Sequence, residues 1–149
     1  MGAAARTALV TGAGSGIGLG IAQALAAKGF RLALVGRDAD KLERARASFP
    51  AGASSPLIAP CDVADRDSVG AMVDRVLGEF GSIEVLICNA GTNVRHRSLE
   101  TLAPADWDRM IATNLTGAFN LVHFVLPSMR SQGGGLIVQV CSIAGIRAS

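Results

Sequence analysis

Five short apolar runs, separated by longer segments with helical periodicity, most restrict the folds open to this chain. The runs are TALVT, LALVG, LIAPC, IEVLIC and LIVQVC, at residues 7–11, 32–36, 57–61, 83–88 and 136–141. Most of them are apolar without strict alternation, which is typical of parallel strands buried on both faces. Because parallel neighbours need a crossover connection, we expect the intervening segments to be helices that cover the sheet.

The segments between these runs have the periodicity of helices. Residues 65–80 place their apolar side chains on one face with a period of 3.6, and Asp65 stands at the start, where negative charge is favourable. Residues 39–49 combine apolar positions with an arginine-rich outer face, and residues 17–29 are apolar nearly all round and end at Gly29. This alternation predicts a doubly wound, mostly parallel α/β sheet in three layers, α/β/α.

Length and composition fit a single domain over residues 1–149. The chain is 50% hydrophobic and only 17% charged, so we expect it to bury a core. Its net charge is +2 with no basic run, which argues against a nucleic-acid partner. We find no apolar stretch of about 18 residues and no cleavable signal peptide, and therefore predict no membrane span and a cytoplasmic location.

The cysteines are three in number and match no CxxC metal spacing. They are Cys61, Cys88 and Cys141. We expect three buried free thiols in a reducing compartment, and no metal site.

The turn after the first run is rich in glycine. It reads TGAGSGIG, residues 11–18, with glycine at every second position from Gly12. Glycines there allow positive φ and let backbone N–H groups approach a pyrophosphate at the start of the next helix. No Lys-Ser/Thr pair follows, which excludes a P-loop, and the spacing is TGxxxGxG instead of GxGxxG. Between a strand and a helix, this turn predicts a nucleotide-cofactor site of the Rossmann type.

Five motifs in order along the chain resemble the short-chain dehydrogenase/reductase family. They are TGxxxGxG, CDV, NAG, NLTG and LIVQVCS, at residues 11–18, 61–63, 89–91, 114–117 and 136–142. The one departure is Cys88, which stands where the family's NNAG motif has its first asparagine. The resemblance covers the whole chain and implies an NAD(P)-binding Rossmann fold and an oxidoreductase.

The resemblance also implies a set of site residues. Those implied for cofactor binding are Gly12, Ser15, Gly16, Ile17, Gly18, Asp62, Val63, Asn89, Ala90 and Gly91. Among them, Asp62 would form a hydrogen bond with the adenine. Those implied for catalysis are Ser142 and Asn114.

The end of the second apolar run decides which cofactor fits. An acidic residue there would bind the ribose diol of NAD, but the position is Gly36, followed by Arg37. A guanidinium at this position can pair with the 2′-phosphate of NADP. Alternatively, Arg37 is a solvated charge before a helix capped by Asp38 or Asp40, and Asp38 would weaken the preference. We predict NADP, with NAD as the alternative.

Two polar residues are candidates for the chemistry. Asn114 lies on the apolar stripe of a long helix expected at residues 104–130, where a buried amide needs partners. It is either bonded to local backbone or, as the resemblance implies, lies at a helix distortion and holds a proton-relaying water; Gly117 favours the distortion. Ser142 follows the fifth run and, as the resemblance implies, would donate a hydrogen bond to the substrate oxygen.

The histidines suggest other chemistry only weakly. His96 and His123 could belong to a nucleophilic Ser-His or Cys-His site, but no acidic partner is placed for such a pair. We expect His123 to be in ordinary packing. Arg95, His96 and Arg97 are expected in a solvated loop, with an anchor for an acidic substrate as the alternative.

None of the 149 residues is tyrosine. The resemblance implies a YxxxK pair roughly a dozen residues after Ser142, whose tyrosine is the general acid/base. We therefore expect a fold that is incomplete on its C-terminal side and a chain that is inactive alone. Its last strand would then be a sheet edge, and its long helix would expose an apolar stripe, so that the chain self-associates. The stripe is Leu115, Phe119, Val122, Val125, Leu126 and Met129.

The leading functional hypothesis is an NADP-dependent oxidoreductase that transfers hydride between the cofactor and a secondary alcohol/ketone pair. By the resemblance, the full-length form would be a homodimer or homotetramer. One alternative is a non-catalytic NADP-binding module or half of a split protein. Another Rossmann-type enzyme, such as a methyltransferase, is less consistent with the NAG turn and with Ser142.

Overall fold

The computed structural model describes residues 6–50, 54–96 and 98–143. Strands and helices alternate through these residues, as the sequence predicts. In chain order they are β1 (Thr7–Thr11), α1 (Gly16–Ala26), β2 (Arg31–Gly36), α2 (Ala39–Ala47), β3 (Leu57–Pro60), α3 (Arg66–Phe80), β4 (Val85–Cys88), α4 (Pro104–Ile111), the π-helical segment η1 (Ala112–Thr116), α5 (Gly117–Ser131) and β5 (Leu136–Gln139).

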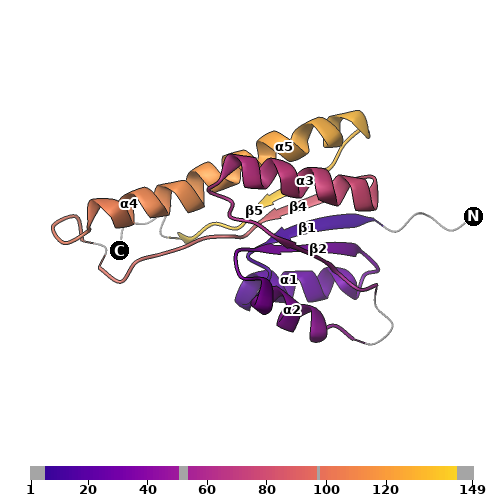
Figure 1. Cartoon of the computed structure of the whole chain (residues 1–149), viewed down its shortest axis with the longest axis horizontal. Helices are drawn as coiled ribbons and strands as arrows, with labels where there is room; N and C mark the ends of the chain where they lie inside the picture. Colours follow the sequence, from indigo (N-terminus) through magenta and orange to yellow (C-terminus); the bar gives the residue numbers. More distant parts are fainter. Residues whose placement is uncertain (1–5, 51–53, 97, 144–149) are drawn as a thin grey trace, which may run out of the picture.

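The five strands form one parallel sheet in the order β3-β2-β1-β4-β5. Leu9 at its centre lies opposite Ala33 on one side and Leu86 on the other. Helices α1 and α2 cover one face of the sheet, and α3 and α5 cover the other (Figure 1). The predicted doubly wound, three-layer α/β architecture is confirmed, with every strand-to-helix turn after β1, β2 and β3 at the carboxyl edge.

Each face of the sheet has its own apolar core. The core under α1 and α2 includes Ala22 and Leu42, and the core under α3 and α5 includes Val73 and Leu121. Val125 and Met129 also belong to the second core, being 0% and 3% exposed. Our expectation that these two would be exposed was wrong, because the inward face of α5 packs against α3 and β4.

Capping side chains fix where two helices begin. Asp65 accepts hydrogen bonds from the backbone N–H groups of Asp67 and Ser68, at 3.0 and 3.2 Å, at the start of α3. Asp38 accepts one from Lys41 N–H at 3.0 Å and so caps α2. The predicted caps therefore set the direction in which the chain leaves β2 and β3.

The long helix expected at residues 104–130 is present but not regular. It begins with Pro104 at its first position, and η1 interrupts it before α5 resumes. Among the described residues, Pro104–Ser131 is long and apolar enough to cross a membrane, with a mean hydropathy of 1.2. We interpret it as a core helix, because part of its apolar surface is packed against the sheet.

Candidate cofactor site

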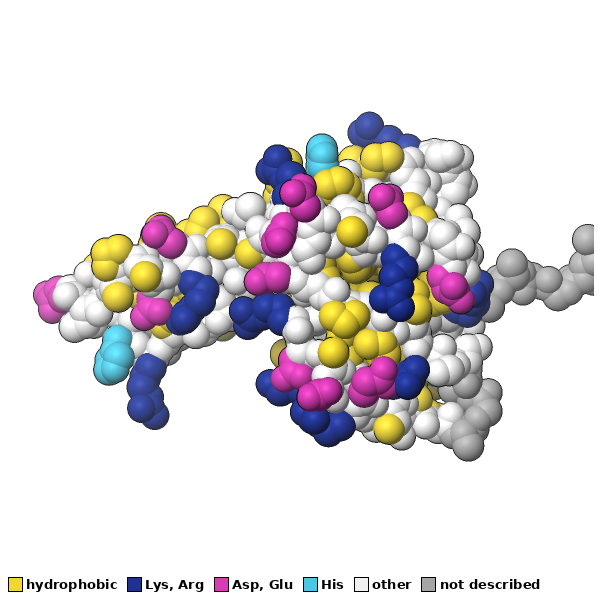
Figure 2. Space-filling model, viewed as in Figure 1, with side chains coloured by type: hydrophobic (Ala, Val, Ile, Leu, Met, Phe, Trp, Pro, Cys, Tyr) yellow, Lys and Arg dark blue, Asp and Glu magenta, His cyan; other side chains and the backbone are white. Residues whose placement is uncertain are grey.

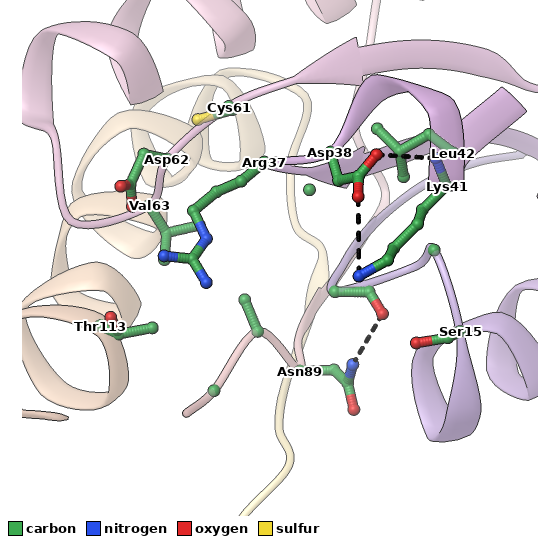
Figure 3. Close-up of a pocket in the computed structure, with 15 residues that line it drawn as sticks. Ser15, Arg37, Asp38, Lys41, Leu42, Cys61, Asp62, Val63, Asn89 and Thr113 are labelled. Carbon is green, nitrogen blue, oxygen red and sulfur yellow. Dashed lines mark hydrogen bonds and ion pairs between the residues drawn. The ribbon is translucent and has the colours of Figure 1, made fainter. Parts of the chain in front are cut away.

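The residues that follow β1, β2, β3 and β4 converge at the carboxyl edge of the sheet and surround one cavity of about 340 Å³. Eight of the predicted cofactor residues line it (Figure 3): Gly12, Ser15, Arg37, Asp62, Val63, Asn89, Ala90 and Gly91. Four separate turns of the chain are therefore brought to one place, where a parallel α/β sheet binds its ligands.

The glycine turn needs glycine for two different reasons. Gly12 and Gly16 have φ of +64° and +55°, a left-handed conformation that favours glycine. Gly18 is required by close approach, since a Cβ there would lie 2.3 Å from the carbonyl oxygen of Gly12. Gly16 and Gly18 do not line this cavity or the second one described below. They shape the turn and the start of α1, where Ser15 is the N-cap. The N-terminal N–H groups of α1 thus lie beside the cavity, as a pyrophosphate requires.

Thr11 and Asn89 connect the turns after β1 and β4. The hydroxyl of Thr11 donates to Ile87 O at 3.1 Å and accepts from the N–H groups of Asn89 and Ala90 at 2.9 and 3.0 Å. The Asn89 amide donates to Thr11 O at 2.9 Å and more weakly to Gly12 O at 3.4 Å. Thr11 was not among the predicted site residues, although it is the first residue of the TGxxxGxG motif.

Arg37 projects into the cavity from the end of β2. In Figure 3 its guanidinium extends toward Val63, while Lys41 lines the same cavity from α2. The carboxylate of Asp38 is engaged by Lys41, through the N–H at 3.0 Å and through Nζ at 3.6 Å. The hydrogen bond from the Lys41 N–H lowers the pKa of Asp38. Gly36 has no side chain at the position where an acidic residue would select NAD, and the nearby Arg37 and Lys41 bring cationic groups to the cavity.

The turn after β3 closes the opposite side of the cavity. Asp62 accepts a hydrogen bond from Ala64 N–H at 3.0 Å, and Val63 is only 5% exposed. Thr113, which was not among the predicted site residues, is buried and lines the cavity from η1. The predicted adenine position therefore lies between this turn and Arg37.

A second cavity, of about 610 Å³, adjoins the first and shares several residues with it. Ile17, Asn114 and Ser142 all line it, so the predicted catalytic residues and the cofactor turn face one space. Asn114 lies in η1, which confirms the expected helix distortion. Its side chain accepts from Thr92 N–H at 2.7 Å and donates to Thr92 O at 2.9 Å. Asn114 therefore holds the loop that follows β4.

Arg95, His96 and His123 line neither of the two cavities. His123 is on the surface of α5, stacked on Phe119 with ring centroids 5.6 Å apart. Arg95 and His96 are exposed, and Arg97 lies outside the described residues. Within the described ranges, no group of three or more His, Cys, Asp or Glu side chains could hold a metal ion.

Two of the three cysteines are buried as expected, and one is not. Cys61 and Cys88 are buried, whereas Cys141 is exposed beside Ser142 on the edge of the sheet, so our expectation of three buried thiols was wrong. Burial raises the pKa of Cys88 to about 11, against a weaker opposing hydrogen bond from Gln139. Cys88 therefore stays a neutral thiol at neutral pH and is not an activated nucleophile.

Known proteins share this architecture. The short chain dehydrogenase family matches residues 6–149. D-threitol dehydrogenase of Mycolicibacterium smegmatis is 42% identical over 139 residues, which are 93% of this chain and 53% of that protein. The crystal structure of NAD+-bound xylitol dehydrogenase is 35% identical with a TM-score of 0.93, over 97% of this chain and 55% of the other. A metagenomic short-chain oxidoreductase in complex with NADP is 34% identical with a TM-score of 0.91, over 97% and 65%. The chain thus spans between 53% and 65% of the length of these proteins.

Proposed function

Since the chain belongs to the short-chain dehydrogenase family, we propose that it binds NADP(H) at the carboxyl edge of its sheet and forms the cofactor-binding part of an oxidoreductase. The observation that carries this proposal is the position of Arg37, in the cavity directly after β2, beside a glycine instead of an acidic residue. A guanidinium there can form charge-assisted hydrogen bonds with a 2′-phosphate. Relatives of solved structure bind NADP in one case and NAD in another, so both cofactors belong to the comparison.

The contacts that Asp38 already makes leave it poorly placed to bind the ribose of NAD. A carboxylate that selects NAD has to accept hydrogen bonds from the ribose diol. Asp38 instead accepts the N–H of Lys41 and pairs with its ammonium group. If Asp38 turned to bind the ribose of NAD, α2 would lose its N-terminal cap. Asp38 should therefore reduce the preference for NADP less than the sequence alone suggests.

The residues at this edge fit such a cofactor. Glycine at Gly12 leaves space that a Cβ would close, since that atom would lie 2.7 Å from Asn89 Nδ2. The glycine turn and the start of α1 would hold the pyrophosphate, and Asp62 and Val63 would hold the adenine. A bound nicotinamide cofactor supplies hydride transfer, here with a secondary alcohol/ketone pair.

Ser142 and Asn114 would act in the adjoining cavity. We propose that Ser142 donates a hydrogen bond to the substrate oxygen, which is most valuable where charge develops on that oxygen. Asn114 would hold the Thr92 loop in place and support a proton-relaying water at the irregular turn of η1. The supporting observation is that both residues line one cavity with Ile17 of the cofactor turn.

The alternative is a non-catalytic NADP-binding module or half of a split protein. The 149 residues include no tyrosine, so none of them supplies the general acid that the resemblance implies. We expect the chain by itself to bind NADPH without reducing ketones. Steady ketone reduction that is lost in Ser142→Ala would show that another group provides the proton.

Assembly and location follow the same family-based reasoning. We propose a cytoplasmic protein, without nucleic acid or membrane as partner, that associates with a second copy. Figure 2 shows hydrophobic side chains among charged ones on the surface over α4. Exposed apolar residues on the α4–α5 face include Trp107, Leu115 and Phe119, at 50%, 65% and 55%. An apolar surface of this kind is typical of an interface.

Fluorescence titration with NADPH and NADH tests the cofactor proposal. The parent chain is expected to bind NADPH more tightly, and Arg37→Asp to weaken NADPH binding by about ten- to a hundredfold and to reverse the order. Arg75→Asp is the matched control, because it makes the same charge change on the exposed side of α3. Equal affinities in the parent chain, or equal effects of both variants, would contradict the assignment to Arg37.

A further inference from the structure

Asn120 is a buried polar residue of α5 that the site described above does not use. Its side chain is 1% exposed. Its amide donates to the carbonyl oxygen of Val63 at 3.0 Å and its oxygen accepts from Nε of Arg66 at 3.4 Å. Burying an amide is unfavourable unless both of its ends are bonded, and here both are.

The carbonyl that Asn120 binds belongs to the turn on the adenine side of the cavity. Residues 61–65 lie between β3 and α3, so strand pairing does not fix the orientation of the Val63 peptide. Two local hydrogen bonds shape the turn: Ala64 N–H to the Asp62 carboxylate at 3.0 Å, and Asp65 N–H to Asp62 O at 3.1 Å. Among the described residues, Asn120 makes the one hydrogen bond to this turn that comes from a helix distant in sequence.

Packing holds the same turn from the same helix. Gly117 and Asn120 are three residues apart and therefore adjacent on one face of α5. A Cβ on Gly117 would lie 2.7 Å from Val63 Cγ2, so only glycine lets the valine approach the helix this closely. Arg66 adds a contact on the outer side, with its guanidinium 5.8 Å from the ring centroid of Phe119.

The two asparagines of this helical region have parallel arrangements. Asn114 binds the backbone of Thr92, in the loop after β4, and Asn120 binds the backbone of Val63, in the turn after β3. Both turns line the cavities at the carboxyl edge. One continuous helical region therefore sets the separation between the turn for the adenine and the loop beside the second cavity.

We propose that Asn120 is a positioning residue of the cofactor site, which holds the Asp62–Val63 turn where it can receive the adenine ring. This inference rests on the proposed binding of NADP(H). Asn120 touches no cofactor atom in this scheme; it acts through the Val63 peptide. Its loss should therefore weaken binding of the adenosine half of the cofactor and leave the contacts of Arg37 and of the glycine turn in place.

Calorimetric titration of the chain with NADPH and with adenosine 2′,5′-bisphosphate tests the proposal. Asn120→Leu keeps the side-chain size and removes both hydrogen bonds, and it should weaken both ligands by a similar factor of about ten. Gln132→Leu is the control, because Gln132 makes the same kind of contact, amide to the Ile83 carbonyl at 2.9 Å, at the other end of α5. Arg66→Gln is a milder variant, because Arg66 is exposed and the substitution removes only one of the two hydrogen bonds of Asn120, the one to its oxygen. It should weaken binding of both ligands about twofold, and it tests the proposal if Asn120→Leu does not fold.

Hydrogen exchange on the ligand-free chain gives a second readout that a general loss of stability would not reproduce. The backbone amides of Ala64 and Asp65 should exchange faster in Asn120→Leu than in the parent chain, and at the parent rate in Gln132→Leu. Each protein is measured at the same number of degrees below its own melting temperature, so that differences in overall stability are matched. Unchanged affinities and unchanged exchange in a folded Asn120→Leu would overturn the proposal while NADP(H) binding by the parent stands. A parent chain that binds neither ligand would instead refute the proposed function on which the inference rests.

Discussion

Strands β1 and β5 both pair with β4, yet they differ in almost every other respect. All five residues of β1 are buried, and the strand pairs with β2 as well as β4. In the described part of the chain β5 pairs with β4 alone, and Leu136 at its start is 57% exposed. β1 leads into the glycine turn, whereas β5 leads toward Ser142 on the exposed edge.

This difference separates the two halves of the candidate site. The cofactor turn is an extension of the best-packed strand, so changes to its geometry should also change the stability of the fold. The serine-bearing segment follows a strand that pairs on one side only in the described residues and has no fully buried residue, so changes there should affect stability less. Substitutions should therefore change cofactor binding and stability together at the first cavity, beside the glycine turn, and affect stability little at the second cavity, beside Ser142.

Truncating one leucine in each strand tests the comparison most directly and should give the largest effect. Leu9 is 0% exposed in β1, so Leu9→Ala should lower the free energy of unfolding by about 3 to 5 kcal/mol, through lost burial and the cavity left behind. Leu136→Ala should lower it by less than about 1 kcal/mol. Urea denaturation followed by circular dichroism measures both, and equal losses would break the comparison.

Two glycines of α1 test whether the cofactor turn is as tightly constrained as the strand before it. In Gly18→Ala the new methyl group would meet the Gly12 carbonyl oxygen and Asn89, which should cost about 2 to 3 kcal/mol and weaken NADPH binding. Gly20 is exposed and a Cβ there meets nothing within 4 Å, so Gly20→Ala should raise stability by up to about 1 kcal/mol. Thermal unfolding and NADPH titration of the pair provide the measurement. A neutral Gly18→Ala would mean that the turn is more adaptable than this packing implies.

Glu84, just before β4, sharpens the comparison with a smaller effect. Its carboxylate accepts hydrogen bonds from Thr7 N–H, at the start of β1, and from Ser82 Oγ, both at 2.6 Å. Toward β5 it offers only its backbone carbonyl, which accepts from Leu136 N–H at 2.8 Å. Partial burial alone would raise the pKa of Glu84, but the hydrogen bonds from Ser82 and Thr7 outweigh it and lower the pKa. Glu84→Gln should cost about 1 kcal/mol at neutral pH.

The sign of the pH dependence follows from that direction. A carboxyl whose pKa is lower in the folded state stabilises the fold above its unfolded-state pKa, and this stabilisation is lost as pH falls through the folded-state pKa. The difference in melting temperature between the parent chain and Glu84→Gln should therefore shrink below the ordinary value of 4.5. A difference that stays constant down to about pH 3 would show that ionisation of Glu84 does not support β1.

The sequence determined the order and the type of the elements. Apolar runs and helical periods are local patterns, and each predicted strand and helix is present within a few residues of its expected bounds. The caps at Asp38 and Asp65 and the positive φ of Gly12 are local as well, so they could be predicted from short stretches. Because all the strands are parallel, the turns that bear Arg37 and Asp62 were expected at the same carboxyl edge, where both line one cavity.

The tertiary structure decided which of these local features meet. Asn114 binds a residue 22 positions away, Asn120 one 57 positions away, and Asn89 one 78 positions away. The errors have the same origin: Cys141 is exposed because no strand lies beside it in the described part of the chain, and Met129 is buried because α5 packs on α3 and β4. Periodicity shows that a face is apolar, but burial depends on what packs against it, and that is fixed only when distant segments come together.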